Sequence, residues 1–191
     1  MASPAHRLCT ADDLVSLGDA AAEIVGGTIV YKADPSAEHG DAQAGLASII
    51  RQAFHRRSGQ GGPGGWWILT EVDVELQLHE VYRPDLVGWR RERVPERPTG
   101  RPIRQRPDWI CEILSTSNAA TDQVDKFRVY ASSGVPFYWL ADPERRILTV
   151  HRLEGANYSV ALQAKHGETV EAPPFEAVPL RVGLLFGEDP D

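Results

Sequence analysis

Apolar residues recur with a helical period in two stretches of the chain. From Ser36 to about Arg57 they recur three and four positions apart, as on one face of an α-helix; they are Ala44, Leu46, Ala47, Ile49, Ile50 and Phe54. The same spacing returns from Asn118 to Ser133, before Gly134 and Pro136, residue types that commonly follow a helix. A short capped helix is also predicted after Thr10.

Runs rich in apolar, β-branched and aromatic residues predict strands in the remaining segments. They are 23–31 (with a Gly-Gly turn), Trp66–Leu69, Val72–Leu78, Leu86–Trp89, Trp109–Leu114, Phe137–Ala141, Ile147–Leu153 and Tyr158–Leu162. This order of helices and strands predicts an α/β or α+β fold with a central mixed sheet. We expect one domain over residues 1–191, with a short N-terminal helical extension and an irregular, Pro-rich tail from Ala172.

Composition narrows the classes of function. With 191 residues, 42% of them hydrophobic and 25% charged, the chain suits one well-buried core. Its net charge of -7 excludes a broadly basic surface, so any nucleic-acid contact must be local. Cys9 and Cys111 are too few for a disulfide framework, which favours the reducing cytoplasm. The sequence lacks an apolar stretch long enough to cross a membrane.

The glycine-rich segment Gly59–Gly65, GQGGPGG, formally contains the G-x-G-x-x-G pattern of a dinucleotide-binding turn. That turn follows a strand and opens a helix, so that backbone N–H groups meet the pyrophosphate. Here the segment follows a predicted helix and opens the strand that begins at Trp66. The context therefore argues against a dinucleotide site.

Two acids interrupt the apolar strand runs. Asp85 begins the run after Pro84, and Glu112 lies within Trp109–Leu114. A buried carboxylate costs several kcal/mol, roughly, unless it is paired, hydrogen-bonded or bound to a cation. If neighbouring strands bring the two acids together, they would suit Mg²⁺ or Mn²⁺, and Lys126 on the next helix could reach them to orient water or offset charge on a phosphate.

Each of these residues also has a structural interpretation. Asp85 could simply start a strand, Glu112 could pair with a nearby arginine, and Lys126 could form a surface pair with Asp122 one helical turn earlier. His39 at a helix start is more often a solvated or capping residue than a ligand. The small polar residues after Glu112 are more typical of a helix N-cap than of nucleophiles; they are Ser115, Thr116 and Ser117.

Four blocks of sequence, in this order and spacing, resemble the bacterial Uma family of restriction-endonuclease-like proteins. They are Tyr82-Arg-Pro-Asp85, Pro107-Asp-Trp-Ile-Cys-Glu-Ile-Leu-Ser115, Asp125-Lys126 with Tyr130, and Gly134-Val-Pro-Phe-Tyr-Trp-Leu-Ala-Asp-Pro143. The resemblance implies the PD-(D/E)xK nuclease superfamily, with a restriction-endonuclease-like fold of a mixed sheet flanked by helices and a Mg²⁺ site built from acids.

Carried over by position, the resemblance implies that Asp85 and Glu112 bind metal, with the backbone carbonyl of Ile113 as a further ligand. A strict E-x-K motif would place lysine at position 114, where this chain has leucine, so Lys126 would act as a relocated lysine. Glu23 and His39 correspond to auxiliary site residues of the family. Glu71 is a weaker candidate, because alternating acids on a solvated strand face need no special explanation.

An arginine-rich segment separates the two acids. Residues 83–106 contain eight arginines and three acids. Its members Arg90, Arg91 and Arg93 could contact DNA phosphates without reading sequence, or the segment could be a solvated loop with scattered salt bridges.

Together these features predict a Mg²⁺-dependent endonuclease that hydrolyses phosphodiester bonds of DNA. A catalytically inactive module of the same fold that binds DNA or a protein partner is the alternative, and the acidic net charge favours it slightly. A metal-dependent hydrolase of another phosphorylated substrate also stays open. The resemblance further allows a homodimer that would cut two strands.

Overall fold

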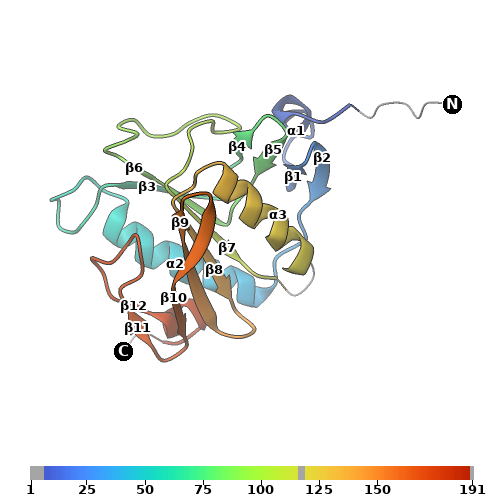
Figure 1. Cartoon of the computed structure of the whole chain (residues 1–191). Coiled ribbons are helices and arrows are strands. Elements are labelled where there is room, and N and C mark those ends of the chain that lie inside the picture. Colours follow the sequence, from blue (N-terminus) through green and yellow to red (C-terminus); the bar gives the residue numbers. More distant parts are fainter. Residues whose placement is uncertain (1–6, 116–118, 190–191) are drawn as a thin grey trace.

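The computed structural model describes residues 7–115 and 119–189, with the backbone alone for residues 119–123 (Figure 1). Its helices are α1 (Ala11–Ser16), α2 (Ala37–Phe54), α3 (Ala119–Ser132) and the 3-10 helix η1 (Val182–Phe186). Its strands are β1 (Ala22–Val25), β2 (Thr28–Tyr31), β3 (Trp66–Thr70), β4 (Val74–Gln77), β5 (Glu80–Tyr82), β6 (Leu86–Arg90), β7 (Trp109–Ile113), β8 (Phe137–Asp142), β9 (Ile147–Glu154), β10 (Asn157–Lys165), β11 (Thr169–Val170) and β12 (Leu180–Arg181).

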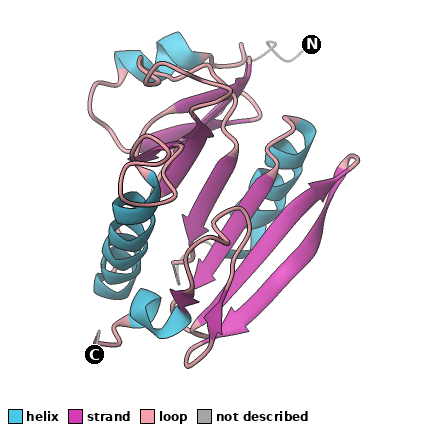
Figure 2. Ribbon diagram, turned by 90° about the vertical axis from the view of Figure 1, so that its left-hand side faces the viewer, coloured by secondary structure: helices cyan, strands magenta, loops and turns pink. Residues whose placement is uncertain are grey.

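The largest sheet has six strands in the order β10-β9-β8-β7-β6-β3. Adjacent strands in this sheet are antiparallel except β7 and β8, which are parallel and are connected through α3. A parallel pair needs such a crossover, because a tight turn can join only antiparallel strands. The predicted mixed sheet flanked by helices is confirmed, and Figure 2 shows helices beside the strands on either side.

The two faces of this sheet pack against different helices. Trp109, Cys111 and Ile113 of β7 belong to the core beneath α2. Ile110, between them, belongs to a second core that includes Tyr130 of α3. Because side chains alternate across a strand, Glu112 faces α3, as Ile110 does. The alternation thus turns the one acid of β7 toward the helix that carries Lys126.

A smaller sheet, β2-β1-β5-β4, lies beside the large one and packs against α1 through Leu14 and Ile24. The predicted turn in the first hairpin is confirmed: Gly26 and Gly27 both have positive φ and join β1 to β2. The chain leaves this sheet at Tyr82 and enters the large one at Leu86. The predicted acid at position 85 therefore lies where the two sheets meet.

The predicted strand Val72–Leu78 differs from the structure at its beginning. Glu71 has a φ of 51°, a left-handed conformation that interrupts the extended backbone after β3. The chain turns there from the large sheet to the small one, and β4 begins only at Val74. Glu71 is thus a corner residue between two sheets and does not belong to a solvated strand face.

The tail from Ala172 also differs from the irregular segment predicted. It forms β12 and η1, and several of its apolar side chains fill the core beneath α2: Phe175, Leu180, Val182 and Leu185. Trp139 Nε1 donates to the carbonyl of Pro173 at 2.6 Å. The tail was not recognisable as structured because these apolar residues follow neither a helical nor a strand period.

Candidate active site

The site is built around Asp85, at the junction of the two sheets. Its side chain is 2% exposed, and its Oδ2 accepts a hydrogen bond from the backbone N–H of Ile113 at 2.7 Å. Its Oδ1 lies 3.3 Å from Lys32 Nζ and 3.4 Å from His39 Nε2. Burial alone would raise the pKa of Asp85, but the bond to His39, the Lys32 charge and the Ile113 amide outweigh it and lower that pKa. The structure therefore favours an ionised Asp85.

His39 reaches Asp85 from the first turn of α2. Ser36 caps this helix by accepting a hydrogen bond from the His39 N–H at 3.2 Å. The hydrogen bond with Asp85 raises the pKa of His39, although burial opposes the shift. His39 Nδ1 is buried and has no hydrogen-bond partner among the described residues. The capped start of α2 thus positions an imidazole next to the acid.

Glu71 completes a three-residue group with His39 and Asp85. Each of the three offers one ligand atom, and these atoms all lie within 4.8 Å of one another. Lys32 Nζ lies 3.3 Å from Glu71 Oε2 and also donates to the Arg83 carbonyl at 2.8 Å. The ammonium of Lys32 therefore bridges two carboxylates that could otherwise share a divalent cation.

A second group of charges lies on the α3 side of β7. Lys126 Nζ is 3.3 Å from Glu112 Oε1 and 3.2 Å from Glu23 Oε2, and the residue is only 5% exposed. Tyr130, one turn later in α3, donates from its hydroxyl to Glu112 Oε1 at 2.6 Å. The Arg83 N–H donates to Glu23 Oε1 at 2.8 Å. One lysine of α3 thus pairs with two buried carboxylates, one from β1 and one from β7.

The pKa of Glu112 is raised to about 7. Burial is the largest cause, and the neighbouring acids Asp85 and Glu23 add to it, while Lys126 opposes it. A carboxyl group that titrates near neutral pH can accept or release a proton under ordinary conditions. The two groups together provide an ionised acid, a titratable acid, an imidazole and two ammonium groups.

Comparison with known proteins shows the family to which the chain belongs. Residues 6–183 match the model of Uma2, described as "Putative restriction endonuclease". The chain belongs to the Uma2 family. A solved structure from Anabaena variabilis ATCC 29413, titled a "putative nuclease belonging to DUF820", superposes on this Uma2 chain with a TM-score of 0.72 and 22% identity, covering 93% of this chain and 97% of that one. The search of curated proteins finds no match.

Five of the site residues predicted from the sequence of this Uma2 protein lie together in the structure. Asp85, Glu112, Lys126, Glu23 and His39 are joined by the contacts described above. The surface-pair interpretation does not fit a lysine that is 5% exposed, and the Asp122 side chain lies outside the described residues. The partners of Glu112 are a lysine and a tyrosine, rather than the arginine considered from the sequence.

Ile113 also lies at this site, through its backbone N–H, which binds Asp85. The predicted role of its carbonyl as a metal ligand stays a prediction. Ser115 lies just beyond β7, whereas Thr116 and Ser117, the other N-cap candidates, lie outside the described residues.

The sequence predicts Glu71 only as a weaker candidate, and it does not predict a role for Lys32 or Tyr130 at this site. Lys32 follows β2 without any recognisable motif, and Tyr130 belongs to one of the four family blocks. Glu71 and Lys32 come from a corner and a loop, where no period applies. An amphipathic pattern does predict that Tyr130 is buried, but it does not indicate what its hydroxyl binds.

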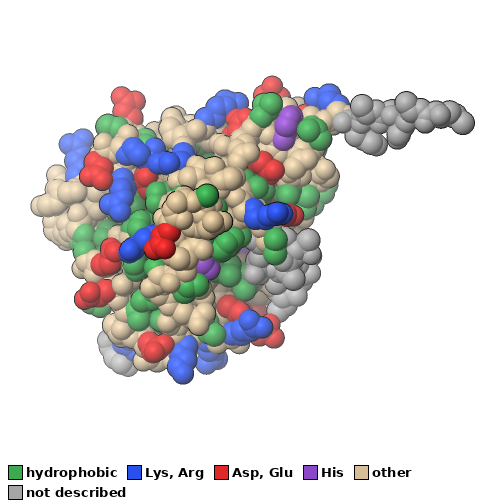
Figure 3. Space-filling view, in the orientation of Figure 1, with side chains coloured by type: hydrophobic (Ala, Val, Ile, Leu, Met, Phe, Trp, Pro, Cys, Tyr) green, Lys and Arg blue, Asp and Glu red, His purple; other side chains and the backbone are tan. Residues whose placement is uncertain are grey.

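Four of the eight arginines in the arginine-rich segment form close ion pairs with acids of the same protein. The buried carboxylate of Asp73 binds both Arg83, at 2.6 Å, and Arg101, at 2.8 Å. Arg93 binds Asp108 at 2.8 Å. Arg104 binds Glu75 at 2.7 Å. On the face shown in Figure 3, positive and negative side chains are interspersed. The salt-bridge interpretation of this segment therefore accounts for many of its arginines.

The three arginines proposed from the sequence to contact DNA lie away from the acids. Arg90 ends β6, the strand that Asp85 precedes, and it pairs in register with Trp66, whereas Leu86 pairs with Thr70 at the other end. Arg90 and Arg91 stack on Trp66 and Trp67 respectively, and Arg93 is paired with an internal acid. Across the described residues, no helix is both long and apolar enough to cross a membrane.

Proposed function

We propose that this Uma2 protein is a metal-dependent endonuclease that hydrolyses phosphodiester bonds of DNA. The observation that carries the proposal is the convergence of Asp85, Glu71 and His39 on one side of the site and of Glu112 and Lys126 on the other. Phosphodiester hydrolysis needs a cation near the phosphate, a group that handles a proton and a charge that offsets the developing anion. These residues supply the last two and can hold the first.

The donor set fits a hard divalent cation. Asp85 would hold it together with Glu71 and His39, whose ligand atoms are already within 4.8 Å of one another, and the Glu112 carboxylate and Ile113 carbonyl complete the set expected from the family motif. The unpartnered, buried His39 Nδ1 shows that this imidazole still has unused hydrogen-bonding capacity. Bound Mg²⁺ or Mn²⁺ would polarise a phosphoryl oxygen and acidify a coordinated water.

Lys126 would orient the attacking water or help to remove its proton, whereas Glu112 would bind the cation. The raised pKa of Glu112, about 7, belongs to the site without a cation, because a bound divalent charge favours the ionised carboxylate. Lys126 is positioned by Glu23 and Glu112 and would place positive charge next to the phosphate oxygens, in the role that leucine at position 114 cannot fill. Tyr130 keeps the Glu112 carboxylate oriented through its hydrogen bond.

The test is cleavage of plasmid, linear duplex and single-stranded DNA in Mg²⁺ or Mn²⁺ by the wild type and by Asp85→Asn, Glu112→Gln and Lys126→Met. Each substitution nearly keeps the shape of its side chain and removes one charge. Glu154→Gln is the matched control, because it removes a charge from an exposed acid at the end of β9. We expect rates to fall at least about 100-fold in the three site variants, as when one transition-state contact is lost.

The inactive-module alternative makes a different prediction. If the wild type and all variants leave every substrate equally intact, and calorimetry detects no Mn²⁺ binding that depends on Asp85, the endonuclease proposal fails. Retained binding of duplex DNA would then support a binding module. Sedimentation of the same samples would show whether the chain forms the homodimer considered from the sequence.

A further inference from the structure

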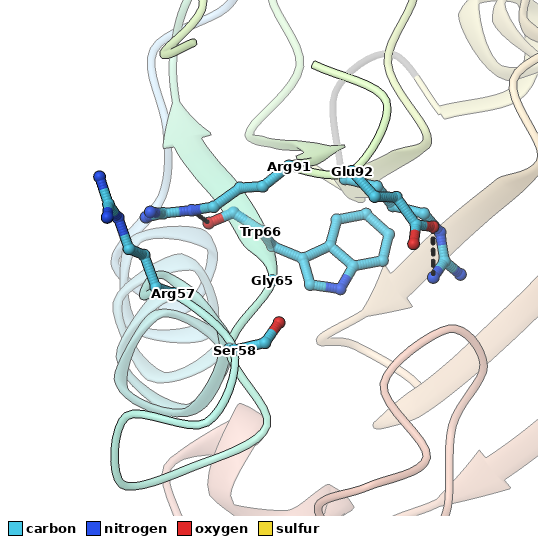
Figure 4. Close-up of a pocket in the computed structure, with 8 residues that line it drawn as sticks. Arg57, Ser58, Gly65, Trp66, Arg91 and Glu92 are labelled. Atoms are coloured by element: carbon cyan, nitrogen blue, oxygen red, sulfur yellow. Dashed lines mark hydrogen bonds and ion pairs between the residues drawn. The ribbon is translucent and has the colours of Figure 1, made fainter. Parts of the chain in front are cut away.

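A pocket of about 410 Å³ lies at the end of the large sheet away from Asp85. Asp85 and Arg90 are five residues apart along β6, which corresponds to about 17 Å at about 3.4 Å per residue. The pocket is lined by the segment that follows α2, the glycine-rich loop, the start of β3 and the end of β6 with the residues just after it (Figure 4); among the lining residues are Arg57, Ser58, Gly65, Trp66, Arg90 and Arg91. The pocket is separate from the proposed active site.

The structure fixes two of the arginines in place. The Arg91 guanidinium stacks 3.5 Å from the centroid of the Trp67 ring, and its Nε donates to the Trp66 carbonyl at 3.0 Å. Its backbone N–H donates to the Gly65 carbonyl at 2.8 Å. Arg90 lies 4.7 Å from the centroid of the Trp66 ring. Pre-organised guanidinium groups lose little freedom when they bind a ligand.

The positive charge of this pocket is not balanced. The guanidinium groups of Arg57 and Arg91 lie next to each other in Figure 4, and among the described residues neither has an acid within 4.0 Å. Partial burial and the nearby Arg57 both lower the pKa of Arg91. Glu92 approaches only Arg90, at 4.0 Å, and its side chain is 79% exposed, so this pair contributes little. The pocket thus contains three cations and one weakly paired acid.

The glycine-rich loop brings these groups together. A Cβ at Gly64, where φ is +59°, would lie 2.5 Å from the Arg57 carbonyl oxygen. A Cβ at Gly65, where φ is +85°, would lie 2.9 Å from Ser58 Oγ. Only glycine lets the loop pass this close to Arg57 and Ser58 while adopting a left-handed conformation. The glycines that do not form a dinucleotide turn therefore shape this pocket.

We propose that this pocket binds the phosphate group of a nucleotide unit. Arginine forks and a serine hydroxyl suit the oxygens of a phosphate. The volume exceeds that of a bare phosphate and falls within the roughly 300–1,000 Å³ of small-ligand sites. The nucleotide unit can belong to a nucleic-acid strand or be free. The nucleic-acid source rests on the proposed function. A duplex bound at Asp85 would reach the pocket about 17 Å away, which corresponds to about five base pairs along its axis.

Binding is measured without divalent cations, in full-length protein carrying Glu112→Gln, so that the result does not depend on cleavage. The probes are a fluorescent 20-base-pair duplex, the corresponding single strand, and AMP, each titrated at several salt concentrations. Arg57→Ala with Arg91→Ala is compared with Arg145→Ala with Lys165→Ala. The control pair removes the same charge from the β8–β9 turn and from β10, the opposite edge strand of the sheet.

We expect the pocket variant to weaken binding of the probe that occupies the site about tenfold, and the control about twofold or less. For the duplex, losing one phosphate contact should reduce the salt slope by about 0.9. Loss confined to the DNA probes identifies a nucleic-acid strand as the source, and loss for AMP alone identifies a free nucleotide. Equal affinities of the pocket and control variants for all three probes would overturn the proposal.

Arg91 also packs on Trp67, so its removal could unfold part of the loop. Arg57→Glu provides a second variant, because Arg57 is exposed at the surface. Unchanged urea unfolding together with weakened binding would support the site. Unchanged unfolding together with unchanged binding of every probe would overturn it.

Discussion

Glu112→Gln in the metal-free protein tests whether Glu112 is held with a raised pKa. An ordinary glutamate titrates near 4.5, whereas Glu112 titrates near 7 in the folded protein. Between these values the folded state binds a proton that the unfolded state has released, so wild-type stability falls as pH rises through this window. The pKa difference of 2.5 (7 minus 4.5), at about 1.4 kcal/mol for each pH unit, corresponds to about 3–4 kcal/mol.

Glutamine stays neutral and can still accept the hydrogen bond from Tyr130. The variant should therefore gain on the wild type from nearly zero at pH 4.5 to about 3 kcal/mol at pH 8. Urea unfolding in EDTA at pH 5, 6, 7 and 8 measures this difference, and Glu154→Gln, an exposed control, should show none. A wild-type-to-variant difference that stays constant within about 0.5 kcal/mol over this range would refute the reasoning.

Four further substitutions test other parts of the structure. Lys32→Met should tighten Mn²⁺ binding about tenfold (about 1.4 kcal/mol), because the wild-type ammonium pairs with two carboxylates of the proposed metal site. Weaker Mn²⁺ binding by the variant in calorimetry would contradict this prediction. Asp73→Ala should lower the free energy of unfolding by about 3–5 kcal/mol, because two arginines lose a buried partner. Glu75→Ala, which breaks a more exposed ion pair, should lower the free energy of unfolding by about 1 kcal/mol or less. Equal losses for Asp73→Ala and Glu75→Ala in urea unfolding would contradict the prediction that the buried pair contributes more. Gly88→Ala should cost about 1–3 kcal/mol in the same assay, because the new Cβ would lie 3.1 Å from the Trp109 ring; unchanged stability would show that the core can adjust.

Local patterns in the sequence were enough to predict the helices and strands and to single out two acids of the site. Helix α2 follows from a period of 3.6 residues, and the strands of the large sheet follow from runs of apolar, β-branched and aromatic residues; both signals depend only on nearby positions. Asp85 and Glu112 could be recognised because a charge within an apolar run is itself a local anomaly. The match to the Uma2 family is consistent with that interpretation.

Tertiary structure decided which charges meet. Glu71 lies at a chain corner and Lys32 in a loop, and the two are 39 residues apart in the sequence. They approach Asp85 only because both segments fold back to the junction of the two sheets. The apolar residues of the tail pack beneath α2 although they follow no regular period. A sequence period reports which face of an element is buried, whereas a site formed by separate elements depends on how those elements pack, and that depends on the whole core.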